Sequence, residues 1–170
     1  MTIRPAVAGD EAAILAIRND PEALFWSASY GAIDPLAQRL WFQTLLRDPT
    51  HGMWVAEESD GQVIGYGRTK IRSVGTVSFG VDKNHRGRGV GTELLQVVDR
   101  WAKVLRVDQQ AWVHPSNIAS VRAFLKLGYR LGGEPAYQLL EKRSDYSSSV
   151  TSSPGGRPVH RSSLLTRWRI

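Results

Sequence analysis

The chain has 170 residues, 42% hydrophobic and 22% charged, which is typical of a single soluble globular domain. It contains no cysteine, which excludes disulfides, cysteine-ligated metal centres and a thiol nucleophile. Half of the net charge of +6 lies in residues 144–170, so residues 1–143 are only mildly basic. That balance favours a small anionic ligand over nucleic acid. No apolar run approaches the roughly 20 residues of a membrane span, so we predict a cytoplasmic protein without membrane contact.

The first third of the chain is expected to contain one strand and two helices. The predicted elements are a strand at 2–5, a helix at 10–18, irregular chain at 22–33 and a helix at 34–48. Asp10 can cap the first helix, and Pro21 ends it because the residue before a proline avoids the helical region. Five apolar residues recur at helical spacing on the second helix and predict its buried face: Leu36, Leu40, Trp41, Leu45 and Leu46.

The rest of the chain alternates strands and helices. The predicted strands are 53–58, 63–71, 76–81, 109–114, 129–132 and 136–142, and the predicted helices follow at 90–105 and 117–127. This order predicts the α/β (α+β) class, with a mixed, mostly antiparallel sheet and helices on both faces. Residues 1–143 form the predicted domain. Residues 144–170 are serine- and arginine-rich, and we predict a C-terminal tail without a packed core.

A glycine-rich stretch, RGRGVG at residues 86–91, stands between a predicted strand and a predicted helix. The first turn of a helix has backbone N–H groups without intrahelical partners, and its dipole favours negative charge. Glycines let a ligand approach the backbone closely, and two arginines add positive charge. The stretch matches neither the Walker loop nor the Rossmann fingerprint. It predicts a site for an anion such as a pyrophosphate, with a tight turn that binds nothing as the alternative.

A second motif lies in residues 112–129, WVHPSNIASVRAFLKLGY. Together the two motifs resemble the GCN5-related N-acetyltransferase (GNAT) superfamily. The first matches its Q/R-x-x-G-x-G/A pattern through Arg86, Gly89 and Gly91. The second matches N-x-x-(A/S)-x-x-x-(Y/F)-x-K-x-G-(F/Y) through Asn117, Ser120, Phe124, Lys126, Gly128 and Tyr129. The predicted element order also resembles that of the family, from the first strand to about residue 142, so residues 1–143 are expected to be a GNAT domain.

The resemblance implies acetyl-CoA as co-substrate and no metal. The amides of the loop would bind its pyrophosphate: Arg86, Gly87, Arg88, Gly89, Val90, Gly91 and Thr92. In the family the preceding strand opens at a bulge and pairs with the pantetheine arm, which places Phe79, Gly80 and Val81 along that arm. Asn117, Phe124 and Lys126 would flank the cofactor.

The implied chemistry is direct attack of an amine on the thioester, which needs an oxyanion donor, a base and an acid. The backbone N–H of Val81 would be the donor. Many family members use a tyrosine where this chain has Phe124, so Tyr129, Tyr30, Ser120 or water remain candidates for the acid. The candidates for the base are His114, His85, Glu57, Glu58 and a water chain. His114 is the leading side chain, and the alternative is that it only holds the turn before Pro115.

The acceptor is expected to bind at the first two helices and their connection, through Arg18, Asn19, Trp26, Tyr30 and Trp41, although Trp41 could instead belong to the core. This region is similar to family members that acetylate nucleotide-linked 4-amino sugars, and to those that act on ribosomal protein N-termini. We therefore predict an N-acetyltransferase for a small-molecule primary amine, with an amino-sugar nucleotide as the leading acceptor. The alternatives are a protein or peptide amine and a non-catalytic acyl-CoA-binding module, and a homodimer stays open.

Overall fold

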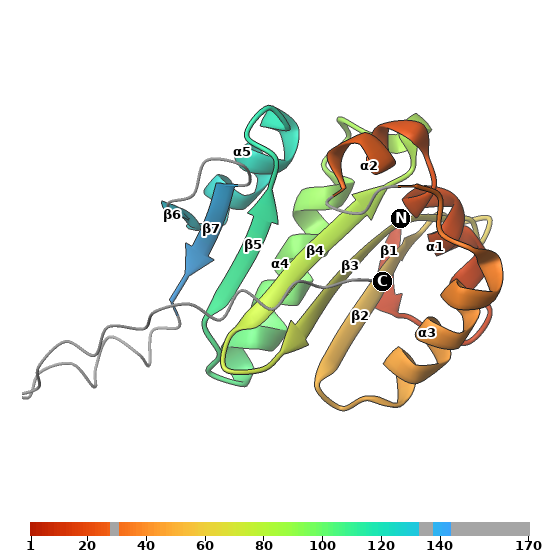
Figure 1. Cartoon of the computed structure of the whole chain (residues 1–170), viewed down its shortest axis with the longest axis horizontal. Coiled ribbons are helices and arrows are strands. Elements are labelled where there is room, and N and C mark those ends of the chain that lie inside the picture. Colours follow the sequence, from red (N-terminus) through yellow and green to blue (C-terminus); the bar gives the residue numbers. More distant parts are fainter. Residues whose placement is uncertain (28–30, 133–137, 144–170) are drawn as a thin grey trace, which may run out of the picture.

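The computed structural model describes residues 1–27, 31–132 and 138–143, which contain one sheet. Its strands are β1 (Thr2–Pro5), β2 (His51–Glu57), β3 (Val63–Ile71), β4 (Gly75–Val81), β5 (Gln109–Val113), β6 (Arg130–Gly132) and β7 (Gln138–Lys142). Their order in the sheet is β1-β2-β3-β4-β5-β7-β6, and every neighbouring pair is antiparallel except β4 and β5 (Figure 1). The predicted fold class, a mixed and mostly antiparallel sheet with helices, is confirmed.

Helices cover both faces of the sheet. They are α1 (Glu11–Arg18), α2 (Pro21–Trp26), α3 (Pro35–Arg47), α4 (Val90–Val104) and α5 (Ile118–Lys126), with a short 3-10 helix, η1, at Lys83–His85. On one face, Ile14 of α1 and Phe42 of α3 pack with Val55 and Tyr66 of the strands. On the other, Leu94 of α4 packs with neighbouring strand residues, and α4 crosses behind the sheet in Figure 1. Burial of these apolar faces holds the layers together.

The parallel strands β4 and β5 are paired at one end only. Gly75 is opposite Gln109 and Thr76 is opposite Gln110, and beyond these two positions the strands diverge (Figure 1). Antiparallel pairing continues on both outer sides, from β4 to β3 and from β5 to β7. The sheet is therefore open in its middle, between β4 and β5.

Irregular chain was expected at residues 22–33, but its first part is helical, because α2 begins at Pro21. Asp20 caps it by accepting from the N–H groups of Glu22 and Ala23. The Asp-Pro pair that ends α1 is also a good beginning for a helix, with proline in the first turn. The same Asp-Pro pair therefore ends α1 and begins α2.

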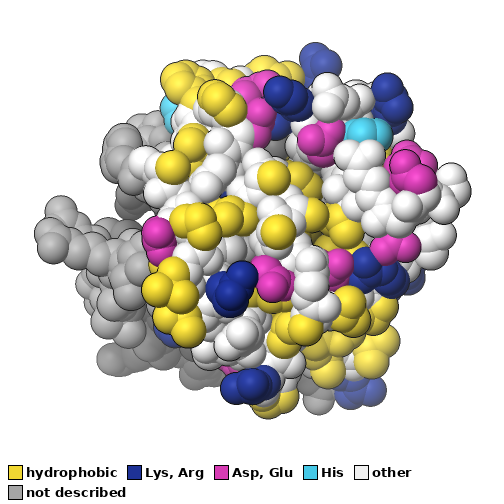
Figure 2. All heavy atoms as spheres, turned by 90° about the vertical axis from the view of Figure 1, so that its right-hand side faces the viewer, with side chains coloured by type: hydrophobic (Ala, Val, Ile, Leu, Met, Phe, Trp, Pro, Cys, Tyr) yellow, Lys and Arg dark blue, Asp and Glu magenta, His cyan; other side chains and the backbone are white. Residues whose placement is uncertain are grey.

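The predicted buried face of α3 is wrong in part. Leu36, Leu40 and Leu46 are exposed, whereas Gln38, Phe42 and Leu45 are buried. Figure 2, which views the molecule from the side of α1 and α3, shows groups of hydrophobic side chains at the surface among charged ones. Spacing alone does not select between two faces of a helix when both carry apolar residues.

In the parts of the chain that are described, no helix combines the length and the apolar character that a membrane span requires. The predicted tail at 144–170 and the first two residues of the last predicted strand, 136 and 137, lie outside the described residues.

Candidate active site

A cleft of about 690 Å³ lies where β4 and β5 diverge. It is bordered by the backbone of β4, the end of β5, α5, the glycine loop with the first turn of α4, and α2. The residues predicted for the cofactor line it with one exception: Phe79, Gly80, Val81, Arg86, Gly87, Gly89, Val90, Gly91, Thr92, Asn117, Phe124 and Lys126. The exception is Arg88, which is exposed and does not line the cleft.

The glycine loop turns through backbone conformations that favour glycine. Gly87 has φ of 76° and Gly89 has φ of 88°, and a Cβ at either position would meet no atom within 4 Å. Gly89 is the N-cap of α4 and provides no side-chain hydrogen bond to the first turn. The N–H groups of that turn are therefore available to an anion at the mouth of the cleft.

Two other glycines are required by side-chain packing. A Cβ on Gly91 would lie 2.6 Å from Cε2 of Phe79, and a Cβ on Gly80 would lie 2.7 Å from Cε1 of Tyr66. The ring of Phe79 thus lies against α4, on the core side of β4. Packing therefore requires glycine at Gly80 and Gly91, in addition to the close ligand approach that the sequence predicts there.

The free edge of β4 presents backbone groups to the cleft. The N–H of Asp82 donates to the carbonyl of Ile64 at 2.8 Å, and Val81 is opposite Gly65. In an antiparallel pair this bond makes Val81 a non-hydrogen-bonded position, so its own N–H and C=O point away from β3. Phe79, two residues earlier, has the same orientation. Beyond Thr76 no strand of the described residues pairs with this side of β4, so these groups face the open middle of the sheet.

The expected bulge in β4 is not found. The register between β3 and β4 runs without a shift from Gly75 to Val81, and the irregularity of this part of the sheet lies between β2 and β3, at Ala56 and Glu57. The opening comes instead from the divergence of β5. An edge without a bulge keeps the alternation of N–H and C=O groups regular, as an extended ligand requires.

The side chain of Arg86 points to α2. Its Nη2 donates to Oδ1 of Asp20 at 2.6 Å, its Nη1 to Oε2 of Glu22 at 2.5 Å, and its Nε to the carbonyl of Val81 at 3.2 Å. The hydrogen bond from Arg86 lowers the pKa of Asp20. Arg86 therefore connects the glycine loop to α2, and its guanidinium is engaged by the two carboxylates there.

The residues predicted on α5 have mixed positions. The side-chain oxygen of Asn117 accepts from the N–H of Ser120 at 3.1 Å and caps the helix, which leaves its amide nitrogen as the donor toward the cleft. Phe124 is only 2% exposed and packs edge-on against Phe79 and Tyr129. Lys126 is exposed at the rim of the cleft, where a cation can meet an anionic ligand.

His114 lies at the end of β5 and lines the cleft. Its Nδ1 accepts a hydrogen bond from the N–H of Ser116 at 3.2 Å. This hydrogen bond engages Nδ1 in the turn that follows β5. The arrangement fits the alternative in which His114 holds the turn before Pro115. Its ring also lies 5.4 Å from that of Trp26 of α2, centroid to centroid.

The residues predicted for the acceptor are divided between the cleft and its support. Arg18 and Trp26 line the cleft. Asn19 does not; its side chain donates to and accepts from the backbone of Ile33, at 2.9 and 2.8 Å, and so fixes the chain before α3. Trp41 is half-buried behind the cleft, where Arg18 stacks on it. Tyr30 lies outside the described residues.

Residues 16–129 match the sequence profile of the acetyltransferase (GNAT) family. The chain belongs to this family.

Similar proteins have related descriptions. The Bacillus subtilis (strain 168) protein provisionally named phosphinothricin acetyltransferase YwnH is 30% identical over 138 residues, which are 76% of this chain and 83% of that protein. A GNAT superfamily phosphinothricin acetyltransferase from Sinorhizobium meliloti, solved in complex with acetyl-CoA, has a TM-score of 0.78, 20% identity, and covers 92% of this chain and 95% of its own. A ribosomal-protein-alanine N-acetyltransferase from Brucella melitensis has a TM-score of 0.72, 26% identity, and covers 84% and 99%.

Two candidates for the base in this GNAT acetyltransferase, Glu57 and Glu58, do not line the cleft. Glu57 of β2 forms an ion pair with Arg4 of the edge strand β1, and Glu58 lies 3.9 Å from the N-terminal amine. His85 lines the cleft, but its Nδ1 is bound to Oδ1 of Asp82 at 2.8 Å. These positions speak against the two glutamates as bases.

Tyr129 is also removed from the candidates for the acid in this acetyltransferase. It is 3% exposed, its hydroxyl donates to Oε1 of Gln109 at 3.0 Å, and burial raises its pKa. We expect Tyr129→Phe to leave turnover unchanged and to cost about 1–2 kcal/mol of stability, because Gln109 loses its donor. Initial rates and urea unfolding measure the two effects. A loss of turnover at saturating substrates would restore Tyr129 as the acid.

Several residues that line the cleft of this acetyltransferase were not predicted from the sequence, among them Tyr66, Arg68 and Glu22. Tyr66 and Arg68 alternate with Gly65 and Gly67 on β3, and alternation places them together on the face of α1 and α3. That pattern was visible, but the cleft was expected at the loop and the helices. Glu22 was missed together with α2.

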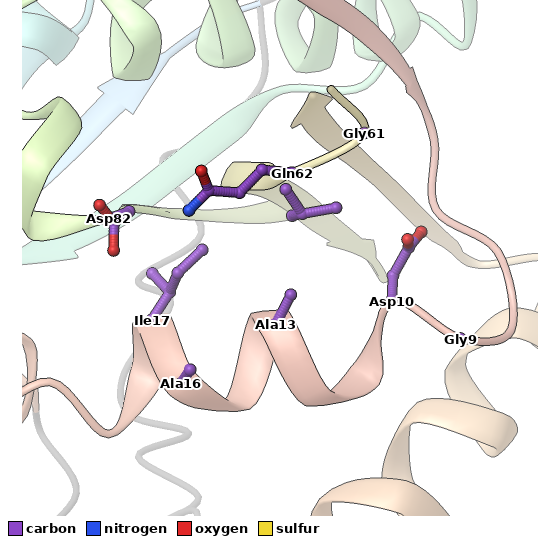
Figure 3. A pocket seen from close by; sticks show the side chains of 9 residues that line it. Gly9, Asp10, Ala13, Ala16, Ile17, Gly61, Gln62 and Asp82 are labelled. Carbon is purple, nitrogen blue, oxygen red and sulfur yellow. The ribbon is translucent and has the colours of Figure 1, made fainter. Parts of the chain in front are cut away.

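The described residues contain no group of three or more His, Cys, Asp or Glu side chains arranged to hold a metal ion. A second depression, of about 400 Å³, lies between α1 and the turn that joins β2 and β3 (Figure 3). Its two carboxylates are already bound: Asp10 to Arg4, and Asp82 to His85. The remaining side chains are small or apolar apart from Gln62, so this depression is not a second active site of the acetyltransferase.

Proposed function

We propose that this protein is an acetyl-CoA-dependent N-acetyltransferase that moves the acetyl group to a primary amine by direct attack. One observation carries the proposal. The open middle of the sheet presents the free edge of β4 to the same cleft as the uncapped first turn of α4. An extended thioester arm with a pyrophosphate at one end fits both features. The arm can pair with the free edge of β4, and the pyrophosphate is an anion that can bind at the first turn of α4.

In this proposal the amides of residues 86–92 bind the pyrophosphate, and the N–H and C=O groups of Phe79 pair with the pantetheine arm. The N–H of Val81 then donates to the thioester oxygen as negative charge develops on it. Asn117 donates from its amide nitrogen to the same arm. The amine loses its proton to solvent, and water protonates the leaving thiolate, because Phe124 has no proton to give.

The relatives support a small-molecule acceptor, since two of them are described as phosphinothricin acetyltransferases. The amino-sugar nucleotide predicted from the sequence stays a more specific proposal. The likeness to a ribosomal-protein-alanine N-acetyltransferase supports a peptide amine as the second candidate. The cytoplasmic location and the homodimer belong to the proposal as well.

The test is release of free thiol from acetyl-CoA in the presence of amines of each class: amino acids, free amino sugars, amino-sugar nucleotides and peptides with a free N-terminus. We expect saturable release with at least one small amine, and a product whose mass has increased by one acetyl group. Acetyl-CoA binding measured by calorimetry, with no release for any amine, would favour the non-catalytic acyl-CoA-binding module instead. Absence of binding would contradict both.

A further inference from the structure

Two arginines lie together in the part of the cleft nearest to α1. Arg18 is the last residue of α1 and Arg68 is on β3, and both line the cleft. Their Cζ atoms lie 4.8 and 5.1 Å from the ring centroid of Trp41, so one indole supports both guanidiniums. Stacking on an aromatic ring fixes a guanidinium and leaves its N–H groups to bind elsewhere.

The polar partners of this pair are neutral. Nη1 of Arg18 donates to Oε1 of Gln38 at 2.6 Å, and Nε of Arg68 donates to Oγ of Ser78 at 2.8 Å. Among the described residues neither arginine forms an ion pair. Other partly buried arginines of the chain differ in this respect: Arg4 is bound to Asp10 and Glu57, and Arg86 to Asp20 and Glu22.

This arrangement is costly without a negative ligand. Burial lowers the pKa of Arg68, and the nearby charge of Arg18 lowers it further, although Tyr66 opposes the shift. Arg68 is surrounded by protein but keeps partial exposure to the cleft. Two like charges in a partly dehydrated site repel each other and lose hydration, and an anion between them relieves both costs.

We propose that Arg18 and Arg68 bind an oxyanion of the acceptor, so that the substrate class is a primary amine that also carries a carboxylate or a phosphate. The inference rests on the proposed acetyl transfer and adds the chemistry of the acceptor. Guanidinium groups match both oxyanions, because each offers two oxygens to a pair of N–H donors. Trp41 positions the two side chains and does not itself line the cleft.

The kinetic test uses matched amines that differ in the anion: alanine against alaninamide for the carboxylate, and glucosamine 6-phosphate against glucosamine for the phosphate. We expect kcat/KM to favour the anionic member of one pair by about tenfold or more, the value of one charge-assisted hydrogen bond. The favoured pair identifies the source of the oxyanion. Equal rates within both pairs would overturn the inference while leaving the acetyltransferase proposal intact.

The variants Arg18→Gln and Arg68→Gln should each abolish that preference through a higher KM for the anionic amine, with the KM for acetyl-CoA unchanged. Arg39→Gln is the matched control, because Arg39 is exposed on α3 and its substitution removes the same charge outside the cleft. The control should keep the preference. A preference that persists in both cleft variants would assign the anion to other residues.

A binding measurement covers the case in which none of these amines is turned over or a variant fails to fold. Acetate and inorganic phosphate are titrated into the wild-type protein already saturated with CoA, so that the glycine loop is occupied. Saturable binding of one of them supports the inference, and its absence for both overturns it. The preceding titration with CoA tests only the proposed cofactor site. A failure of the proposed function is therefore distinguishable from a failure of the inference about the anion.

Discussion

Replacing Gly89 with valine is expected to raise the KM for acetyl-CoA about 100-fold. A β-branched residue at φ of 88° is strained by about 1–3 kcal/mol, so the loop relaxes and turns its amides away from the anion. A charge-assisted bond lost to the pyrophosphate costs about 1.5–3 kcal/mol, so the loss of one such bond near the upper value accounts for the expected change. Steady-state kinetics and calorimetric titration with acetyl-CoA measure it.

Gly61 offers a matched control for this experiment. It has φ of 87°, a Cβ there would meet no atom within 4 Å, and it lies in the turn before β3, outside the active-site cleft. Gly61→Val should lose a similar amount of stability and bind acetyl-CoA normally. Equal affinities in the two variants would show that the loop does not bind the cofactor. Gly91→Ala should instead act on stability, because its Cβ would lie 2.6 Å from the ring of Phe79.

Removing the carboxylate of Asp99 is expected to lower the free energy of unfolding by about 3 kcal/mol, the effect of breaking a buried ion pair from one side. Asp99 of α4 is 7% exposed and accepts from Nζ of Lys142 at 2.8 Å and from Nε2 of Gln109 at 2.9 Å. In Asp99→Ala the amide of Gln109 loses this acceptor, Lys142 keeps the carbonyl of Leu127 but loses its carboxylate partner, and β7 loses a bond to α4. Urea unfolding at pH 7 measures the difference.

The contribution of Asp99 depends on pH in a defined direction. Burial alone would raise its pKa, but the hydrogen bond and charge of Lys142, with smaller effects from Gln109 and Lys103, bring the pKa below the ordinary 3.8. A group whose pKa is lower in the folded state stabilises the fold at pH above its unfolded pKa. This stabilisation is lost as the pH falls through the folded pKa. The gap between wild type and Asp99→Ala should therefore be full at pH 6 and shrink below pH 4.

Glu141→Ala is the control, since Glu141 is exposed and precedes Lys142 on β7, with its side chain on the opposite face. It should change stability little at any pH. A gap for Asp99→Ala that stays constant down to the acid transition would mean that the carboxylate contributes through packing rather than charge.

Much of the fold was predictable because its elements have strong local signals. Alternation predicted β2, β3 and β4, and the glycine loop with its following apolar face predicted α4. What failed had competing local solutions: Asp20-Pro21 both ends α1 and begins α2, and α3 carries apolar residues on two faces. Only tertiary packing decides such cases.

The candidate site was predictable as a loop and a motif but not as a set of side-chain roles. Spacing places Arg86 at the anion site, but its guanidinium finds Asp20 and Glu22, which are far away in sequence. Glycines look alike in the sequence, although Gly89 is required by its φ and Gly91 by its distance from Phe79. Arg68 was missed because it stands out by having no carboxylate partner among the described residues, and the sequence does not show which side chains surround a residue in space.

The divergence of β4 and β5 creates an edge strand in the interior of a sheet. An edge on the outside invites another protein chain to pair with it, and sheets must protect such edges against aggregation. Here β5 stands across the opening and remains joined to β4 at Gly75 and Thr76, so the gap is a wedge closed at one end. Because the wedge is closed at one end, it has room for one extended ligand but not for a strand that belongs to a second sheet. A ligand that fills the wedge completes the sheet, and its concentration then contributes to the stability of the whole domain.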